Sequence, residues 1–350
     1  MHTSAHASFH TLGLSEPLLR DLTAAGLVVP TPIQAQAIPP ALEGRDVIGC
    51  AQTGTGKTAA FVIPMIERLA ALPKGQPQAL ILAPTRELAL QISGAIEKLG
   101  RSHSISATVI VGGSDMQAQI RGLRQRPDVL VATPGRLLDH MWNGTVNLAP
   151  MKILVLDEAD RMLDMGFAPQ INQILDALPI ERQTLLFSAT IQTDVTHLVQ
   201  TSLSGAVRVM ITPASTTAEG VTQTVHHTSS QEKTKLLVSL LATERGTVLI
   251  FARTKSRVDR LGQSLEQAGH RVAVIHGDRS LPQRLRALDG FKRGQVRILV
   301  ATDIAARGID VANIGHVVNY DMPNCPEDYI HRIGRTARMK MTGRATSFVT

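Results

Sequence analysis

The sequence predicts two tandem α/β domains, each a doubly wound parallel sheet, joined by a short linker. Short apolar runs alternate with helix-like segments through residues 1–211, and the alternation restarts in residues 221–350. Between them, residues 212–220 (TPASTTAEG) are small and lack hydrophobic periodicity, which predicts the linker. Alternation of strands and helices at this spacing is typical of parallel sheets, and 350 residues are enough for two domains.

The first domain is expected to begin with two short helices after a disordered start at residues 1–8. Ser15 is the predicted N-cap of a helix that stops at Gly26, and a second helix is predicted from Gln34 to Leu42. Further along, strands are predicted in the apolar run ending at residues 50–51 and at residues 79–83, 105–111, 128–132, 152–156, 184–187 and 207–211.

The second domain repeats the pattern, and the given sequence ends in or just after a strand. With no closing helix in view, we expect that this domain is truncated at its C-terminus. Its strands are predicted at residues 221–227, 248–251, 272–275, 297–300, 316–318 and 346–349.

Composition narrows the class of protein. The net charge of +7 favours polyanionic partners, nucleic acid first, with solubility or acidic partners as alternatives. Aromatic residues are only 3% of the chain, so a nucleic acid would be held mainly by its sugar-phosphate backbone. No apolar stretch approaches a membrane span, and the first ten residues, which have no basic head or apolar core, are not expected to be a signal peptide. Cys50 and Cys325, the only cysteines, form no metal pattern, which favours a cytoplasmic protein.

A glycine-rich stretch, AQTGTGKT at residues 51–58, follows an apolar run and precedes a helix-like segment. A strand, a glycine-rich loop and a helix in this order predict a phosphate-binding loop, because backbone N–H groups and the helix N-terminus then face the anion. Lys57 would reach the β- and γ-phosphates, and the Thr58 hydroxyl would ligate Mg²⁺. The alternative is a glycine-rich turn with a surface lysine.

The acidic segment DEAD at residues 157–160 follows a buried strand. Ligands of open parallel sheets bind at the carboxyl ends of strands. Asp157 is therefore predicted to hold Mg²⁺ together with Thr58, and Glu158 to orient or deprotonate the attacking water. A helix cap would be the alternative for an acidic cluster on its own.

With these and about eight further motifs in order from Phe9 to Arg338, the sequence resembles a DEAD-box ATP-dependent RNA helicase, closest to the bacterial RhlE-type branch. The resemblance implies two RecA-like domains with ATP and Mg²⁺ as cofactors. It implies that Phe9 stacks on adenine, with a hydrophobic staple as the alternative, and that Gln34 reads the adenine edge. Leu27 stands where the family often has an aromatic residue. The ATP-binding group implied is Phe9, Gln34, Thr53, Gly54, Thr55, Gly56, Lys57, Thr58 and Asp310.

The resemblance also implies residues that contact RNA and residues that couple hydrolysis to unwinding. Leu281 departs from the family, which usually has glutamine there, and Gln283 is the nearby candidate to replace it. The implied RNA-contacting residues are Arg86, Gly113, Thr133, Gly135, Arg136, Arg253, Gly277 and Thr302. The implied coupling residues are Ser188, Thr190, Arg307 and His331, with helix capping as an alternative role for the first two.

The segment HRIGRTAR at residues 331–338 resembles the arginine-finger motif, so Arg335 and Arg338 should reach the γ-phosphate. The catalytic set implied is therefore Lys57, Asp157, Glu158, Arg335 and Arg338. Ala337 stands where the family has glycine, which is costly if the backbone takes a positive φ.

The implied function is RNA-stimulated ATP hydrolysis coupled to local unwinding of short RNA duplexes or to remodelling of RNA–protein complexes. We expect a monomer without membrane association. Ribosome assembly, RNA decay and cold adaptation are all compatible roles. A DNA-directed helicase or another P-loop ATPase is the enzymatic alternative, and an RNA-binding clamp with incidental hydrolysis is the non-enzymatic one.

Overall fold

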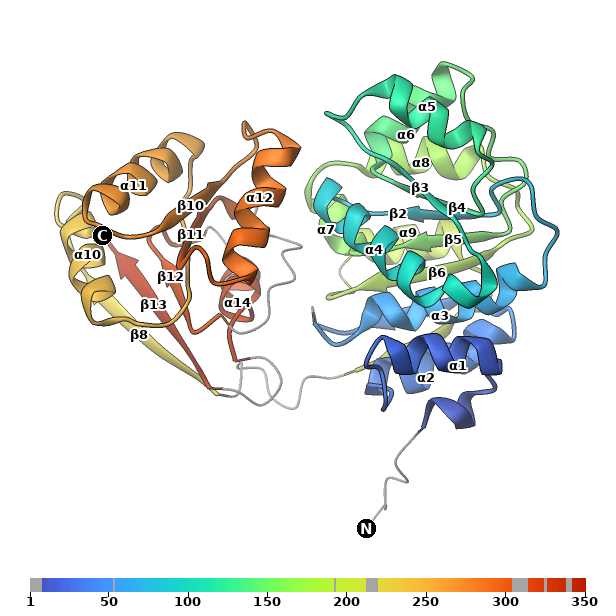
Figure 1. The fold of residues 1–350 in the computed structure, drawn as a ribbon, viewed down its shortest axis with the longest axis horizontal. Coiled ribbons are helices and arrows are strands. Elements are labelled where there is room, and N and C mark those ends of the chain that lie inside the picture. Colours follow the sequence, from blue (N-terminus) through green and yellow to red (C-terminus); the bar gives the residue numbers. More distant parts are fainter. Residues whose placement is uncertain are drawn as a thin grey trace, which may run out of the picture. The chain divides into compact units, whose positions relative to one another are not determined.

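A computed structural model describes residues 8–52, 54–191, 193–211, 220–303, 314–323, 326–337 and 342–350. The chain divides into two compact units, residues 1–213 and 214–350 (Figure 1). Each unit is a parallel sheet with helices on its faces, so the predicted fold class is confirmed. The predicted linker lies outside the described residues except for Gly220, and the limits of the domains stay a prediction.

The first unit contains a seven-stranded, fully parallel sheet in the order β3-β4-β2-β5-β6-β1-β7. The strands agree with the predicted runs to within a few residues. Their bounds are β1 (Val47–Cys50), β2 (Ala79–Leu82), β3 (Ala107–Ile110), β4 (Val129–Ala132), β5 (Ile153–Leu156), β6 (Gln183–Ser188) and β7 (Val207–Met210).

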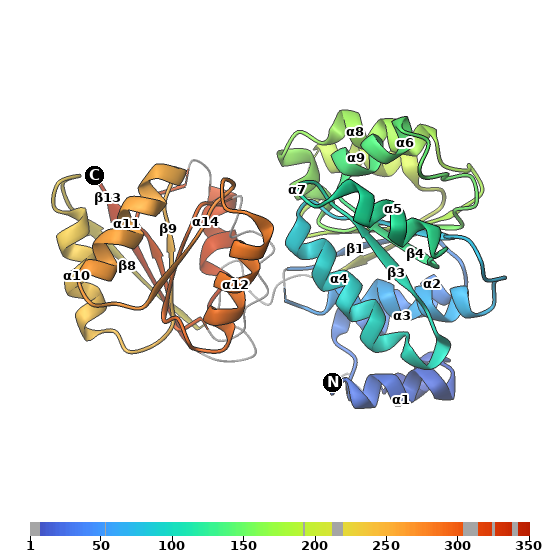
Figure 2. The same ribbon diagram turned by 45° about the horizontal axis from the view of Figure 1, so that its top comes forward.

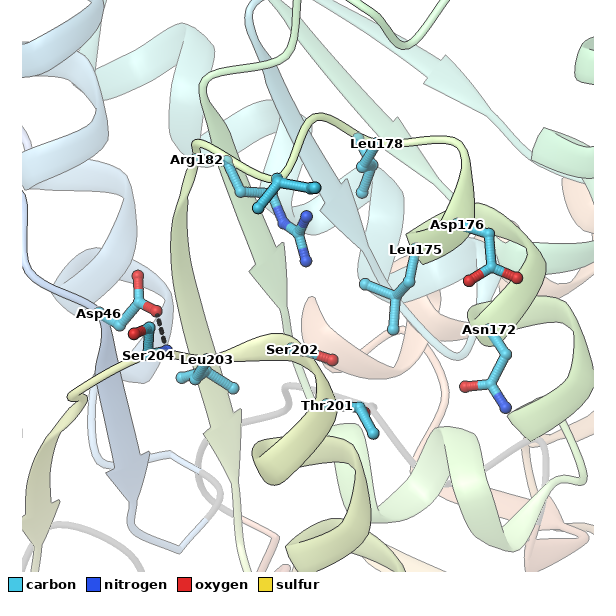
Figure 3. Close-up of a pocket in the computed structure, with 11 residues that line it drawn as sticks. Asp46, Asn172, Leu175, Asp176, Leu178, Arg182, Thr201, Ser202, Leu203 and Ser204 are labelled. Atoms are coloured by element: carbon cyan, nitrogen blue, oxygen red, sulfur yellow. Dashed lines mark hydrogen bonds between the residues drawn. The ribbon is translucent and has the colours of Figure 1, made fainter.

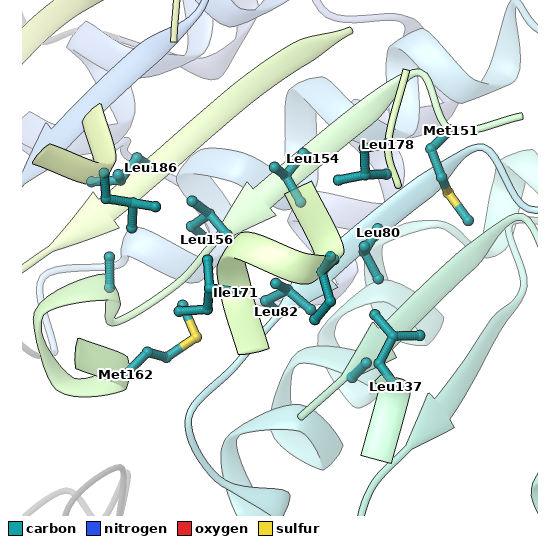
Figure 4. Packing of buried hydrophobic residues seen from close by; sticks show 14 of the residues in the cluster. Leu80, Leu82, Leu137, Met151, Leu154, Leu156, Met162, Ile171, Leu178 and Leu186 are labelled. Atoms are coloured by element: carbon teal, nitrogen blue, oxygen red, sulfur yellow. The ribbon is translucent and has the colours of Figure 1, made fainter. Parts of the chain in front are cut away.

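Helices cover both faces of this sheet, which is why the central strands are apolar on both sides. On one face, alternate residues such as Leu80, Leu154 and Leu186 pack against Leu137 and Ile171 of two helices (Figure 4). The helices are α1 (Glu16–Ala24), α2 (Pro32–Leu42), α3 (Lys57–Ala70), α4 (Arg86–Leu99), α5 (Met116–Arg124), α6 (Pro134–Trp142), α7 (Ala159–Asp164), α8 (Ala168–Asp176) and α9 (Thr193–Ser202), with short 3₁₀ helices η1 (Phe9–Leu12) and η2 (Arg101–His103).

Local sequence explains how α1 and α2 begin and end. Ser15 is the N-cap of α1 as predicted, although its side chain makes no capping hydrogen bond, and Gly26 follows the helix with φ 78°. Helix α2 begins at Pro32, two residues before the predicted start. The Gln34 side chain accepts from the Thr31 backbone N–H across that first turn, and proline is favoured at the first helical position.

The second unit contains a six-stranded parallel sheet in the order β10-β11-β9-β12-β13-β8. Its strands match the predicted runs, except that β13 begins three residues earlier than expected. The bounds are β8 (Val221–His227), β9 (Val248–Phe251), β10 (Val272–Ile275), β11 (Ile298–Ala301), β12 (His316–Asn319) and β13 (Gly343–Val349); the helices are α10 (Lys233–Thr243), α11 (Lys255–Gln267), α12 (Leu281–Lys292) and α14 (Pro326–Ile333).

Successive side chains of β9 point alternately into two hydrophobic clusters of the second unit. Val248 and Ile250 face the cluster that includes residues of α10 and α11, whereas Leu249 and Phe251 face the cluster that includes α12. Figures 1 and 2 show α10 and α11 on one side of this sheet and α12 and α14 on the other. Within the described part of the chain, no helix has both the length and the apolarity needed to cross a bilayer.

Candidate active site

The sequence motifs of the first unit gather along one edge of its sheet. Neighbouring strands β5, β6 and β1 lead into the acidic segment, the Ser188–Thr190 segment and the glycine-rich loop. Strands β3, β4 and β2 lead into the three segments expected to contact RNA. Because all the strands are parallel, each of these six segments lies at a carboxyl end, and the segments expected to bind nucleotide and RNA occupy adjoining stretches of the same edge.

The glycine-rich loop adopts backbone conformations that glycine allows and other residues rarely take. Gly54 and Gly56 have φ of 85° and 91°, which L side chains rarely adopt, and α3 begins at Lys57. The Lys57 side chain is buried, and its Nζ donates to the Ala51 carbonyl at 2.7 Å. The Thr58 side chain at the first turn of α3 is half-buried, whereas Thr53 lies outside the described residues.

Gln34 connects the amino-terminal helices to this loop. Its Oε1 accepts from the Thr31 backbone N–H at 2.9 Å, and its Nε2 donates to the Gly56 carbonyl at 3.1 Å. Phe9 is only 2% exposed, so its ring is buried within the protein. Its stacking on adenine stays a prediction, as does the base-reading role of Gln34.

Asp157 and Glu158 lie buried beside the loop. Burial, with the charge of Glu158 next in weight, raises the pKa of Asp157 to about 7, although Lys57 opposes the rise. The Glu158 N–H donates to Asp157 Oδ1 at 3.0 Å, and the Glu158 backbone adopts φ 50°. A cation bound there would offset the negative charges of these neighbouring carboxyls.

Asp160 is a residue of the acidic segment to which the sequence interpretation gave no role. Its Oδ2 accepts from the Ala189 N–H at 3.0 Å, the Thr190 N–H at 2.9 Å and Thr190 Oγ1 at 3.1 Å. Ser188 Oγ in turn donates to the Thr190 carbonyl at 2.6 Å. The carboxylate therefore holds the predicted coupling segment against the acidic segment. Only the pairing of β5 with β6 reveals this contact.

Strands β2, β3 and β4 bring together the residues expected to contact RNA in the first unit. A Cβ at Gly113 would overlap the Arg86 guanidinium, so the glycine lets that arginine lie across the loop. Arg136 donates to the Ser114 carbonyl at 3.3 Å, which ties α6 to the same loop. Thr133 is the N-cap of α6, and Gly135 lies in its first turn. Contact with RNA itself stays a prediction.

In the second unit, Arg253, Gly277 and Thr302 follow β9, β10 and β11, three adjacent strands. Arg253 is exposed and donates through NH2 to the Met322 carbonyl at 3.2 Å, while Thr302 is buried. The Oε1 of Gln283, the candidate to replace glutamine at position 281, accepts from the Ser280 N–H at 2.9 Å in a capping box. Leu281 is buried at the start of α12.

Arg332 holds the arginine-rich segment onto the second sheet. It is 3% exposed, pairs with both carboxylate oxygens of Asp303, and donates to the Asp321 carbonyl at 2.6 Å. Its guanidinium lies 4.9 Å from the centre of the Phe251 ring. The sequence interpretation assigned Arg332 no role. An arginine guanidinium suits this position because it can form two parallel hydrogen bonds to one carboxylate.

The predicted finger Arg335 is buried, 5% exposed, so it must turn outward to reach a phosphate. His331 is half-buried in α14. The Ala337 backbone adopts φ 54°, the strained conformation that the glycine of the family avoids. The remaining predicted site residues of this unit, Arg307, Asp310 and Arg338, lie outside the described residues.

Comparison with known proteins identifies the family. Residues 31–198 match the family model described as DEAD/DEAH box helicase, and residues 232–340 match the helicase conserved C-terminal domain. The DEAD-box ATP-dependent RNA helicase CshA of Geobacillus kaustophilus is 44% identical over 344 residues, covering 98% of this chain and 73% of that protein. The chain therefore belongs to the DEAD-box helicase family.

Solved structures show the same fold. Dbp5 of S. cerevisiae, solved bound to RNA and ADP BeF3, superposes with a TM-score of 0.88 at 35% identity, covering 98% of this chain and 89% of that one. Mss116p bound to ssRNA and AMP-PNP superposes with a TM-score of 0.90 at 28% identity, covering 100% and 76%.

Proposed function

We propose that this protein is an ATP-dependent RNA helicase that couples RNA-stimulated ATP hydrolysis to local unwinding of short duplexes or to remodelling of RNA–protein complexes. The supporting observation is the single edge of the first sheet, where the phosphate loop, the acidic segment and the coupling segment adjoin the segments with Arg86 and Arg136. RNA bound at one part of this edge lies next to the residues that act on the nucleotide.

The roles of the nucleotide-binding residues follow from their chemistry. The N–H groups of Gly54 to Thr58 and the N-terminus of α3 bind the phosphates, and Lys57 exchanges the Ala51 carbonyl for phosphate oxygens. Glu158 orients the attacking water and accepts its proton. Phosphoryl transfer of this kind depends on positioning and charge neutralisation more than on covalent chemistry.

The residues also fit Mg²⁺. This ion is usually held by one or two carboxylates together with substrate phosphates, not by a closed protein cage, and the described residues contain no group of three or more His, Cys, Asp or Glu that would form one. Thr58 and Asp157 would hold it, and the bound ion would neutralise the charge that develops on the phosphates.

The second unit supplies charge that the first lacks. In residues 1–213 acidic and basic residues nearly balance, so the net positive charge of the chain resides in residues 214–350. In our proposal Arg253, Gly277 and Thr302 bind the RNA backbone. Asp310 binds the ribose of ATP, and Arg335 and Arg338 bind its γ-phosphate, while Arg307 and His331 transmit closure. ATP and RNA then strengthen each other's binding by linkage.

The test is ATP turnover by the full chain at one stated salt concentration, because phosphate contacts make affinity salt-dependent. Single-stranded RNA should stimulate turnover strongly and DNA of the same sequence should not. Lys57→Ala and Glu158→Gln should each abolish the stimulated rate, since each removes a group acting on the transferred phosphate. Turnover at the parent rate in either variant would refute the site, and stimulation by DNA alone would favour a DNA-directed enzyme.

A strand-displacement assay separates unwinding from clamping. With ATP, each protein should be released after hydrolysis and should open many short RNA duplexes in turn. With a non-hydrolysable analogue, each protein should act once, so that few duplexes are opened. If the analogue released as many duplexes per protein as ATP does, hydrolysis would not be needed and the protein would act as a clamp.

We further propose that the protein belongs to the RhlE-like branch, that it is a cytoplasmic monomer, and that it acts in ribosome assembly or RNA decay. These three proposals rest on the sequence resemblance.

A further inference from the structure

The loop at residues 111–115, which contains two glycines and is expected to contact RNA, begins at a carbonyl that the sheet does not pair. The Ile110 carbonyl accepts from the segment that follows β4. Successive carbonyls of a strand point to opposite sides, so the Val111 carbonyl points toward the open side of β3, the outermost strand. Nε2 of Gln119, a buried residue of α5, donates to this carbonyl at 2.8 Å. A side chain thus supplies the partner that a further strand would otherwise provide.

A histidine of α6 determines which way the glutamine amide points. The Val111 carbonyl can only accept, so the NH₂ group of Gln119 must face it, and Gln119 Oε1 then faces His140 Nε2 at 2.9 Å. The ring must therefore carry its hydrogen on Nε2. His140 is 0% exposed, and its Nδ1 lies 2.8 Å from the Thr145 hydroxyl, which can donate to it. Burial, with the charge of Arg136 next in weight, lowers the pKa of His140, which favours this neutral form.

Helix α6 holds the loop at both ends. His140 and Arg136 lie four residues apart on the same face of the helix. The histidine acts on the start of the loop through the glutamine, while Arg136 donates to the Ser114 carbonyl at 3.3 Å, near its end. Between these anchors Gly113 has φ 72°, and a Cβ there would overlap the Arg86 guanidinium. The arginine therefore lies directly against a loop whose course these two anchors fix.

We propose that Gln119 and His140 are positioning residues for RNA binding. Both are buried, so they act through the loop and not by contact with RNA. The histidine N–H orients the glutamine amide, the amide holds the Val111 carbonyl, and the loop keeps Arg86 and the backbone of Gly113 in place for RNA phosphates. This inference rests on the proposed function, because it assigns the two residues a part in binding the RNA that stimulates hydrolysis.

The test replaces the ring nitrogens. His140→Phe keeps an aromatic ring but removes the N–H, so the amide of Gln119 is free to turn. The RNA concentration that gives half-maximal ATP turnover should rise at least about fivefold, the usual effect of one buried hydrogen bond. The values of kcat at saturating RNA and of KM for ATP should stay within about twofold of the parent. His140→Gln, whose amide N–H can take the position of ring Nε2, should restore the RNA concentration to within about twofold.

The control weakens the same unit without touching the loop. Leu178 is buried in the hydrophobic cluster that also contains Leu137 of α6. It lines a cavity of about 670 Å³ at the amino ends of β1, β6 and β7, at the opposite edge of the sheet (Figure 3). Leu178→Ala should lower the free energy of unfolding, because it removes buried apolar contacts, and should leave the RNA concentration within about twofold of the parent.

Binding of a labelled single-stranded RNA, followed by fluorescence anisotropy with a non-hydrolysable ATP analogue, separates this inference from the proposed function. A parent that binds RNA without stimulated turnover would refute the proposed function alone, and the dissociation constant should still rise in His140→Phe. Gln119→Leu should show the same rise and serves if His140→Phe does not fold. Parent-like RNA binding in these variants, failure of His140→Gln to restore binding, or an equal rise in Leu178→Ala would each overturn the inference.

Discussion

The Arg161 guanidinium donates to Glu158 Oε2 at 2.8 Å, with only 7% and 11% of the two side chains exposed. The pair spans the first turn of α7, where residues three apart lie on the same face. Glu158 reaches this position through its left-handed backbone, a conformation that is costly for a residue with a side chain. A buried ion pair therefore fixes the carboxylate that our proposal makes responsible for orienting water.

Arg161→Gln should lower kcat for RNA-stimulated ATP hydrolysis by about tenfold or more, while leaving KM for ATP close to the parent value. The physical reason is that removal of one partner leaves a buried carboxylate unpaired, which costs about 3–5 kcal/mol in comparable pairs. Steady-state kinetics at saturating RNA measure this. Arg161→Lys should restore part of kcat, and Arg124→Gln should change neither constant. A rise in KM alone would indicate a role in ATP binding instead.

The raised pKa of Asp157 predicts how stability depends on pH. The folded-state pKa is about 7 and the ordinary value is 3.8, so between these the unfolded chain loses a proton that the folded chain keeps. The contribution to stability is thus fully present below about pH 4 and is lost as pH rises to about 7.

Urea unfolding of the metal-free and nucleotide-free protein at pH 5 and pH 8 checks this. The parent should lose about 2 kcal/mol more than Asp157→Asn over that interval, because the amide does not titrate. The comparison of the two proteins cancels every other titrating group. Equal losses in parent and variant would show that Asp157 titrates normally.

Gly56→Ala should weaken ATP binding by at least about tenfold. The glycine has φ 91°, and a Cβ there would overlap the Gln34 amide nitrogen, so the substitution displaces both the loop and the glutamine. Titration with a fluorescent ATP analogue measures the affinity. Gly144→Ala is the control: φ is 64°, nothing lies within 4 Å of the added Cβ, and only about 1–2 kcal/mol of stability should be lost. Normal ATP binding by Gly56→Ala would show that the contact between Gln34 and Gly56 is not needed for ATP binding.

Ala337→Gly should stabilise the chain by about 1 kcal/mol, because alanine at φ 54° carries strain that glycine does not. Ser104→Gly, at φ 51° in the first unit, is the matched control and should show a gain of similar size. Urea unfolding measures both, and RNA-stimulated ATP turnover tests whether alanine disturbs Arg335. We expect turnover within about twofold of the parent. A large increase in rate would show that the alanine misplaces the finger.

Sequence patterns predicted the strands well because buried parallel strands are continuous apolar runs, and runs as short as 79–82 and 153–156 are typical of strands in length. They placed the start of α2 too late because the prediction did not recognise Thr31 as the N-cap and Pro32 as the first helical residue. They missed the roles of Asp160 and Arg332, because neither motif shows what the side chain contacts: Asp160 bonds across to residues after β6, and Arg332 to Asp303 and residues at the end of β12.

By itself, the sequence determined the alternation of strands and helices, the phosphate loop and the family, because local hydrophobic periodicity and the special backbone of glycine are written in neighbouring residues. Only the tertiary structure decided the strand order, and with it which motifs adjoin. It also decided that Gln34 holds Gly56 and Arg161 holds Glu158, and that a cavity forms at the far edge of the first sheet. The physical reason is that these contacts form in the packed interior. There, burial and geometry determine which side chains meet, and the spacing of residues along the chain does not specify either.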